Sequence, residues 1–437
     1  MKVLIDGDKK MAQRGIREFH GKKMMAKYWT EYFPKLAKYD GKIVLVDPKT
    51  DMDELAKQNA WLKQETLVVK PDQLIGKRGK HNLILLNATF NEAKKWLNEH
   101  MNKDITIGKV TDKLTYFLIE PFVPHDKNKE YYVAITSNRE GDAIYFSAHG
   151  GVDIESVWDT VVTIQVPILS NIDDIEIAAK LPKEVPEEEK SMVAEFIKGL
   201  FKFYVDLGYA YLEINPMAMA KDAFIPLDTV ARLDDTTQFV CGNKWGDIEF
   251  PAPFGRRLTK EERFVKDLDK KSGASMKLTV INPKGRVWTL VAGGGASVVY
   301  TDTVFDLGFK DELANYGEYS GNPSTDETYQ YTKIILDLMT REKNPKGKIL
   351  IVGGGIANFT DVAKTFTGII KALKEYKQQL IDNKVKIYVR RGGPNYQEGL
   401  KNMKDLGKIL GVPIKVFGPE AHMTSIVPMA LKGNAGE

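Results

Sequence analysis

Glycine-rich loops that follow short apolar strands constrain the fold of this chain most strongly. Strands are expected at 287–292, 348–352, 385–389 and 414–417, and the loops after the first three contain Gly293-Gly294-Gly295, Gly353-Gly354-Gly355 and Gly392-Gly393. A helical pattern follows each loop. Strand–loop–helix units in series predict a parallel, doubly wound sheet of the flavodoxin type, in which ligands bind beyond the carboxyl ends of the strands.

The same loops carry groups that bind anions. Glycine allows close backbone approach, and the following helix presents free N–H groups at its N-terminus. Hydroxyl, amide and guanidinium groups are added by Ser297, Asn358, Thr360, Arg390 and Arg391. An arginine at a strand end can hold a carboxylate through two parallel hydrogen bonds. The loops therefore favour a small ligand with several carboxylates.

A dinucleotide site is the main rival for the glycine loops. Its fingerprint is G-x-G-x-x-G with an acidic residue about 20 positions further on. Gly353 and Gly355 fit, but Asn358 occupies the place of the third glycine. The position about 20 residues on falls inside an expected helix and is not acidic. The pattern argues against a nicotinamide cofactor.

The first half of the chain mixes strands and helices in the manner of an α+β domain. Strands are expected at 42–47, 66–69, 82–88 and 116–123, a hairpin at 131–136 and 143–147, and a strand pair at 211–220 and 224–227. A helix is expected at 186–207 because apolar residues recur there at helical spacing. Pro, Gly and charged residues between about 241 and 275 indicate a linker or boundary.

Polar groups at strand ends in this half could hold a nucleotide. Period-two alternation places Glu213 and Asn215 on one face, and a hairpin would bring Asp228 beside them as oxygen ligands for Mg²⁺. The spacing alone favours a polar hairpin with solvated acids. Lys70, near the basic loop 77–79, could hold the phosphates. Residues 120–123 could face the adenine ring, and Glu130 could accept hydrogen bonds from the ribose hydroxyls. Residues 150–153 could cover phosphates or simply form a turn.

Composition limits the remaining function classes. A length of 437 residues predicts two or three domains. No apolar run reaches the roughly 20 residues of a membrane span, and the N-terminal apolar stretch is too short for a signal peptide. The single cysteine, Cys241, fits a reducing compartment. The small net charge of +4 argues against nucleic acid as a partner. We expect a cytoplasmic metabolic protein.

Nine segments together resemble one family. The chain is similar to the N-terminal half of ATP-citrate lyase and citryl-CoA synthetase, equivalent to the β-type subunit of succinyl-CoA synthetase. The resemblance runs from about Met11 onward and rests on 67–74 (LVVKPDQL), 118–125 (LIEPFVPH), 211–216 (YLEINP), 244–250 (KWGDIEF), 271–275 (KSGAS), 291–300 (VAGGGASVVY), 313–321 (LANYGEYSG), 356–360 (IANFT) and 389–400 (VRRGGPNYQEGL).

The resemblance implies site residues as well as a fold. It implies an ATP-grasp domain at 11–242 and a citrate-binding, flavodoxin-like domain at 243–437. ATP would be bound by Lys70, Arg78, Gly79, Pro121, Val123 and Glu130. Mg²⁺ would be held by Asn215 and Asp228, with a second cation position at Asp269, Ser272 and Ala274. Citrate would lie against Ala292, Gly293, Gly294, Ser320, Gly321, Asn358, Phe359, Thr360, Tyr376 and Arg391.

The resemblance also implies a partner. No histidine of this chain lies in the family's phosphohistidine motif. An α-type subunit would carry that histidine, most of the CoA site and, in a lyase, the domain that cleaves citryl-CoA to acetyl-CoA and oxaloacetate. This chain, in a hetero-oligomer, would supply ATP and citrate binding. Met11 could be an alternative start, and Arg232 stands where lysine is typical of the family.

Two alternatives remain open at this point. One is a succinyl-CoA synthetase β subunit, against which the segments 356–360 and 389–400 argue. The other is a binding or scaffold subunit without turnover, against which the retention of Lys70, Asn215, Asp228 and Arg391 argues. Whether the partner includes the lyase domain is not encoded in this chain.

Overall fold

The computed structural model describes residues 13–76, 78–108, 110–151, 154–220 and 223–432. The chain divides into two compact units between Arg257 and Leu258, and each is described by itself. Residues 242 and 243, where the sequence placed the boundary, lie in α9 (Gln238–Trp245). That helix packs Cys241 and Trp245 into the core of the first unit. None of the described helices is both long and apolar enough to cross a membrane.

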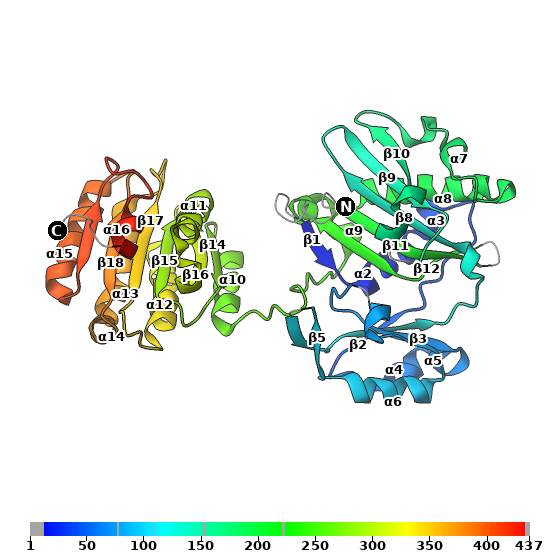
Figure 1. Ribbon diagram of the computed structural model, residues 1–437, viewed down its shortest axis with the longest axis horizontal. Coiled ribbons are helices and arrows are strands. Elements are labelled where there is room, and N and C mark those ends of the chain that lie inside the picture. The colour runs from blue at the N-terminus through cyan, green and yellow to red at the C-terminus, as the bar shows by residue number, and fades with distance from the viewer. Residues whose placement is uncertain (1–12, 77, 109, 152–153, 221–222, 433–437) are drawn as a thin grey trace. The chain divides into compact units, whose positions relative to one another are not determined.

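The first unit contains two antiparallel sheets that carry most of its strands (Figure 1). The larger has the order β1-β13-β11-β8-β9-β10, with β12 also paired to β11. Its strands are β1 (Gln13–Ile16), β8 (Glu130–Ser137), β9 (Gly141–Ser147), β10 (Val162–Pro167), β11 (Tyr209–Ala220), β12 (Ala223–Pro226) and β13 (Thr229–Asp234). The smaller has the order β2-β7-β3-β4, formed by β2 (Val44–Val46), β7 (Phe117–Pro121), β3 (Leu67–Pro71) and β4 (Leu85–Ala88).

Helices cover these sheets in two separate groups. The smaller sheet is accompanied by α4 (Met52–Gln58), α5 (Trp61–Gln64) and α6 (Phe90–His100) (Figure 1). The larger is accompanied by α2 (Glu18–Lys27), α3 (Trp29–Tyr32), α7 (Ile177–Lys180), α8 (Glu187–Asp206) and α9. A separate hairpin is formed by β5 (Asp104–Ile107) and β6 (Val110–Lys113). The first unit thus has two lobes, each with its own hydrophobic core.

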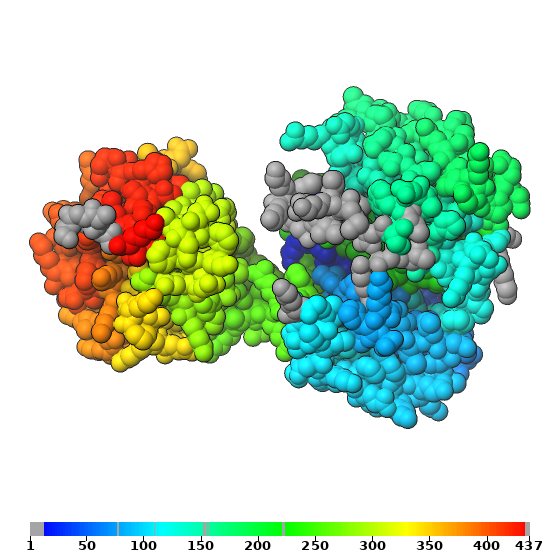
Figure 2. Space-filling model, in the orientation of Figure 1, coloured from blue at the N-terminus to red at the C-terminus, as the bar shows by residue number. Residues whose placement is uncertain are grey.

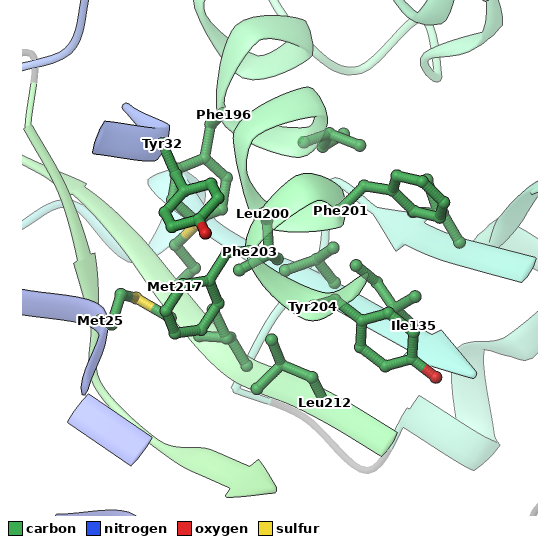
Figure 3. Close-up of a cluster of buried hydrophobic side chains, with 14 of the residues drawn as sticks. Met25, Tyr32, Ile135, Phe196, Leu200, Phe201, Phe203, Tyr204, Leu212 and Met217 are labelled. Carbon is green, nitrogen blue, oxygen red and sulfur yellow. The ribbon is translucent and has the colours of Figure 1, made fainter. Parts of the chain in front are cut away.

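The long helix α8 anchors the core of the larger lobe. Three glutamates in its first turn interact favourably with the positive, N-terminal end of the helix dipole. Gly208, with φ of +66°, follows the C-terminus of the helix. Its apolar face is buried, as the spacing predicted. Figure 3 shows Phe196, Leu200 and Tyr204 of α8 beside strand residues such as Ile135 and Leu212.

The second unit is a six-stranded sheet covered on both faces. The order is β14-β16-β15-β17-β18-β19, and all neighbours are parallel except β14 with β16. The strands are β14 (Ser275–Val280), β15 (Val287–Ala292), β16 (Asn315–Ser320), β17 (Ile349–Gly354), β18 (Lys386–Arg390) and β19 (Ile414–Phe417).

Period-two alternation sends the side chains of each central strand into two cores. Along β15, Trp288 and Leu290 enter one core and Val287 and Val291 enter the other. The first core is closed by α10 (Lys260–Lys271), α12 (Thr325–Thr340), α13 (Val362–Glu375), α14 (Lys377–Asp382) and α15 (Tyr396–Leu410). The second is closed by α11 (Gly294–Val304) and α16 (Ile426–Lys432). The doubly wound arrangement follows from this pattern.

Gly199 provides a test of packing in the α8 core. A Cβ at this position would lie 2.4 Å from the Tyr32 carbonyl oxygen and 2.7 Å from the Phe33 ring. We predict that Gly199→Ala lowers the unfolding temperature of the first unit by a few degrees. Overpacking a core costs about 1–3 kcal/mol, and we expect the upper end of that range because the new Cβ would clash with a backbone carbonyl. This cost exceeds the ~1 kcal/mol that alanine gains over glycine in a helix. Differential scanning calorimetry measures this shift.

Gly242 in α9 is the matched control for that substitution. A Cβ there meets Gln238 Cγ at 3.5 Å, an ordinary contact. Gly242→Ala should leave the unfolding temperature unchanged or raise it, because only the helix-propensity term applies. An unfolding temperature for Gly199→Ala equal to or above that of the unmodified protein would contradict the packing described for α8.

Candidate functional site

A pocket of about 930 Å³ lies in the first unit and is lined by both of its lobes. Figure 2 shows the smaller lobe in blue and cyan and the larger lobe in green as adjoining masses. The smaller lobe contributes residues of β3, β7 and the segment after β7. The larger lobe contributes Tyr132, Tyr211 and Glu213 from β8 and β11. A cleft between two sheets with polar groups at its base is the common form of a small-ligand site.

The pocket collects every residue of this unit that the sequence assigned to ATP or Mg²⁺. These lining residues are Lys70, Arg78, Gly79, Pro121, Val123, Glu130, Asn215 and Asp228. Gly151, from the loop suspected of covering phosphates, also lines the pocket. Lys77, Val152 and Asp153 lie outside the described residues.

The basic end of the pocket is a buried network of ion pairs. Lys70 Nζ lies 2.7 Å from Glu18 Oε1 and 3.0 Å from Glu120 Oε1, and it donates to the Leu227 carbonyl. Arg78 Nη2 lies 2.5 Å from Glu18 Oε2 and also pairs with Asp228. Charged groups at this depth must be paired, because burial removes their hydration.

Glu18 and Lys22 belong to this network although sequence reasoning did not select them. Lys22 Nζ lies 2.7 Å from Glu18 Oε1 and 2.8 Å from Glu120 Oε2. Burial opposes ionisation of Glu18, but Lys22, Lys70 and Arg78 outweigh it and hold its pKa below the usual range. The i,i+4 spacing of Glu18 and Lys22 is the one local signal, and it is also typical of a solvated helix face.

The other end of the pocket carries groups suited to an adenosine. His125 Nδ1 lies 2.7 Å from the Val123 carbonyl oxygen, and its Nε2 lies 2.8 Å from Glu130 Oε1. The ring therefore ties the segment after β7 to the start of β8. Glu130 also lies against Gly151, where a Cβ would come within 2.2 Å of Glu130 Oε2. Glycine is favoured there by its φ of +70°, which other residues adopt only with strain.

The oxygen donors Asn215 and Asp228 lie side by side, as the hairpin interpretation required. The Asn215 amide N–H donates to the Asp228 carbonyl at 2.9 Å. Asn215 Oδ1 accepts from the Gly151 amide at 2.8 Å, and Asp228 pairs with Arg78. Tyr211, Glu213 and Asn215 line the pocket, as alternation along β11 predicts. One carboxylate and one amide oxygen fit Mg²⁺, which also takes phosphate oxygens and water.

In the second unit the glycine loops meet at one edge of the sheet. Register places Ala292 beside Tyr319 on β16 and beside Gly354 on β17, and Ile356 is bridged to Gly392. The carboxyl ends of four neighbouring parallel strands are therefore adjacent. They bring together the predicted residues Ala292, Gly293, Gly294, Ser320, Gly321, Asn358, Phe359, Thr360 and Arg391.

Arg391 and its neighbour Arg390 are both buried at this edge. Arg391 is 6% exposed, and its Nη1 donates to the Gly355 carbonyl at 2.7 Å. Burial lowers its pKa, and the neighbouring Arg390 adds to that effect. The bond to Gly355 uses one of the five N–H donors of a guanidinium. Gly354 lies directly against this group, since a Cβ there would be 2.6 Å from Arg391 Nη1.

Four other predicted site residues of this unit are placed differently from the residues of the loop edge: Tyr376, Asp269, Ser272 and Ala274. Tyr376 directly follows the C-terminus of α13, which has 14 residues. The full length of that helix, at about 1.5 Å per residue, separates Tyr376 from the loop before α13. Asp269 is occupied, since it accepts from the Met276 amide and the Lys277 ammonium, each at 2.7 Å. The Ser272 hydroxyl accepts a hydrogen bond from the Ala274 amide. A Cβ at Gly321 would lie 3.3 Å from the Ala274 Cα. No cluster of three or more His, Cys, Asp or Glu that could hold a metal occurs among the described residues.

Comparison with known families assigns both units. The ATP-citrate synthase ATP-grasp domain matches residues 12–245, and the ATP citrate lyase citrate-binding domain matches residues 256–433. ATP-grasp domains bind ATP together with a divalent cation. The pocket of the first unit and the loop edge of the second each fall within the corresponding match.

Individual relatives agree with this assignment. The chain is 52% identical over 423 residues to ATP-citrate synthase of Bos taurus, and it spans 38% of the length of that relative. It is 47% identical to ATP-citrate synthase alpha chain protein 2 of Arabidopsis thaliana, with 97% of this chain and 99% of that protein covered. The plant name "alpha chain" thus refers to the protein that matches this chain, not to a partner of the succinyl-CoA synthetase α type.

A solved structure supports the fold over nearly the whole chain. The ATP citrate lyase of Methanothrix soehngenii, in complex with citrate and coenzyme A, superposes with a TM-score of 0.87 at 55% identity. The match covers 96% of this chain and 100% of that one. The predicted fold class is confirmed, and the chain belongs to the ATP-citrate synthase, or ATP citrate lyase, family, of which it carries the ATP-grasp and citrate-binding domains.

Proposed function

We propose that this chain is the ATP- and citrate-binding component of an enzyme that activates citrate for transfer to CoA. The observation that carries the proposal is the first-unit pocket, which brings two buried cations, two oxygen donors and Glu130 into one cleft. The family match and the citrate and coenzyme A bound in the archaeal relative support the choice of substrates.

In the ATP-grasp domain the two ends of the pocket have different tasks. Lys70 and Arg78 would bind the nucleotide phosphates, with Gly79 admitting close backbone approach. Pro121 and Val123 would face the adenine, and Glu130 would accept the ribose hydroxyls. Asn215 and Asp228 would ligate Mg²⁺, which neutralises charge on the transferring phosphoryl group when bound. These roles follow from the family resemblance and fit the chemistry of each residue.

In the second domain the loop edge would hold citrate. Arg391 offers a planar guanidinium to one carboxylate, and the backbone N–H groups at the start of α11 face the same edge. Asn358, Thr360 and Ser320 add neutral polar groups that suit the hydroxyl and the remaining carboxylates. Tyr376 stays outside the group on which this proposal rests, as do Asp269, Ser272 and Ala274 as a cation position.

The complete reaction would require a partner. ATP bound here would phosphorylate a histidine of an α-type subunit, that phosphoryl group would pass to citrate, and the thiol of CoA would displace phosphate to give citryl-CoA. The animal relatives extend well beyond the part that this chain matches, whereas the plant relative of equal length is named a chain. The plant name supports a separate protein for the remaining steps, including any cleavage to acetyl-CoA and oxaloacetate.

The first prediction from this function concerns the chain alone. The purified chain should bind Mg-ATP and citrate but release ADP at no more than background rate with citrate and CoA, because it lacks the phosphoryl-accepting histidine. Adding the α-type partner should start ADP release. A coupled ADP assay with and without the partner measures this, and full turnover by the chain alone would refute the division of labour.

The second prediction separates the two domains. Asn215→Ala and Asp228→Ala should each abolish ADP release in the presence of the partner, because a cation ligand is lost. Citrate affinity, measured by isothermal titration calorimetry, should stay within about twofold, because the citrate groups lie in the other unit. A citrate affinity that falls together with activity would show that the sites are not separable in this way.

The third prediction concerns the citrate pocket. Arg391→Ala should lower citrate affinity at least about tenfold, since charge-assisted hydrogen bonds contribute roughly 1.5–3 kcal/mol and ~1.4 kcal/mol is one decade. Arg391→Lys should recover only part, because an ammonium lacks the planar fork. Mg-ATP affinity is the internal control and should not change. Citrate affinity within about twofold for Arg391→Ala, or succinate binding as tight as citrate, would show that the proposed citrate pocket is wrong.

A further inference from the structure

Glu18 stands out because it is a buried carboxylate that touches both phosphate-binding cations without lining the pocket. Its side chain is 2% exposed, and it begins α2 in the larger lobe. Its Oε1 lies 2.7 Å from Lys70 Nζ and its Oε2 lies 2.5 Å from Arg78 Nη2. Both cations line the pocket, but Glu18 does not. Lys70 and Arg78 are therefore its direct contacts with the pocket lining.

The start of α2 is fixed in place by the smaller lobe. Asp72, directly after β3, accepts hydrogen bonds from the Glu18 and Phe19 amides at 2.9 and 3.0 Å. The Arg17 guanidinium donates to the Asp72 carbonyl at 2.7 Å and stacks over Tyr116. These contacts leave little freedom to the Glu18 backbone. The carboxylate is thus held at a defined point behind the two cations.

The other carboxylate partners of the two cations are engaged elsewhere as well, and neither of them contacts both cations. Glu120 is shared between Lys70 and Lys22. Arg78 has Asp228 as its second carboxylate, but Asp228 is also the proposed Mg²⁺ ligand. Once Asp228 ligates the cation, Glu18 is the carboxylate that still holds Arg78, with the Pro71 carbonyl at 2.8 Å as its neutral partner.

We propose that Glu18 is a positioning residue that fixes the direction of Lys70 and Arg78 for the phosphates of the nucleotide. The proposal rests on the assignment of this pocket to Mg-ATP. Lys22, on the next turn of α2, supplies a counter-charge and keeps the network balanced without reaching the pocket lining. Glu18 therefore acts on the phosphate end of the site and not on the adenosine end around Val123 and Glu130.

Glu18→Gln tests this role because the amide keeps the shape but loses the charge. In the full chain we expect Mg-ATP affinity to fall at least about tenfold by calorimetry. Adenosine affinity, measured by competition against a fluorescent adenine nucleotide, should stay within about twofold. The ratio of the two affinities is the readout that simple loosening of the fold would not change, because a loosened pocket loses both ligands in parallel.

Glu189→Gln is the matched control. Glu189 is also a buried glutamate in the first turn of a helix, and it accepts from the Tyr131 hydroxyl at 2.7 Å and pairs with Lys129. It does not line the pocket. Glu189→Gln should lower the unfolding temperature by a few degrees, as Glu18→Gln should, and leave the affinity for Mg-ATP unchanged.

A double variant separates charge balance from positioning. Glu18→Gln with Lys22→Met restores a neutral network, so the unfolding temperature should rise toward that of the unmodified chain while Mg-ATP affinity stays low. Recovery of both quantities would overturn the proposal, as would Mg-ATP affinity within twofold for Glu18→Gln or a parallel loss of adenosine. If the unmodified chain bound no Mg-ATP, the assignment of the pocket itself would fail instead.

Discussion

The first domain depends on a buried network of ion pairs, some of which join its two lobes. Lys22 comes from α2 beside the larger sheet, whereas Lys70 and Glu120 come from the smaller sheet. Glu18 and Glu120 each pair with both lysines, and the Glu18–Lys70 and Glu120–Lys22 pairs cross that division. A charge removed from water without a partner destabilises a fold by several kcal/mol. Separation of the lobes would break the pairs that cross between them, so the network holds the base of the pocket in place as it joins the lobes.

The second domain depends on a different constraint, the common direction of its parallel strands. Neighbouring parallel strands end at the same edge of the sheet. Loops that are far apart in the sequence therefore become adjacent because of the strands, without needing direct contacts with one another. Close packing supports this edge. A Cβ on Gly353 would lie 2.6 Å from the Tyr300 ring, so glycine lets α11 pack against the end of β17. The glycines there serve packing as well as ligand approach.

Local patterns allowed much of this architecture to be predicted, and non-local pairing accounts for what was missed. The strands at 287–292 and 414–417 and the helix α8 have strong apolar periodicity, and the structure has them there. β16, with the sequence NYGEYS, contains no aliphatic side chain and was not predicted, yet it lies between β14 and β15. Glu18 was missed because its partners are 52 and 60 residues away, at Lys70 and Arg78. The proximity of Asp228 to Asn215 was predicted because a hairpin places the two side by side.

The two sites neutralise their cations in opposite ways, which suits the ligands proposed for them. Lys70 and Arg78 are each paired with carboxylates, so a nucleotide phosphate must share them, and ligation of a cation by Asp228 would release part of Arg78 for that purpose. Arg391 has a backbone carbonyl as its partner and forms no ion pair with the described carboxylates. Its burial disfavours an unpaired charge, so an incoming carboxylate would supply the missing counter-ion. Under the proposed function the first site would exchange partners during phosphoryl transfer, whereas the second would gain one when citrate binds.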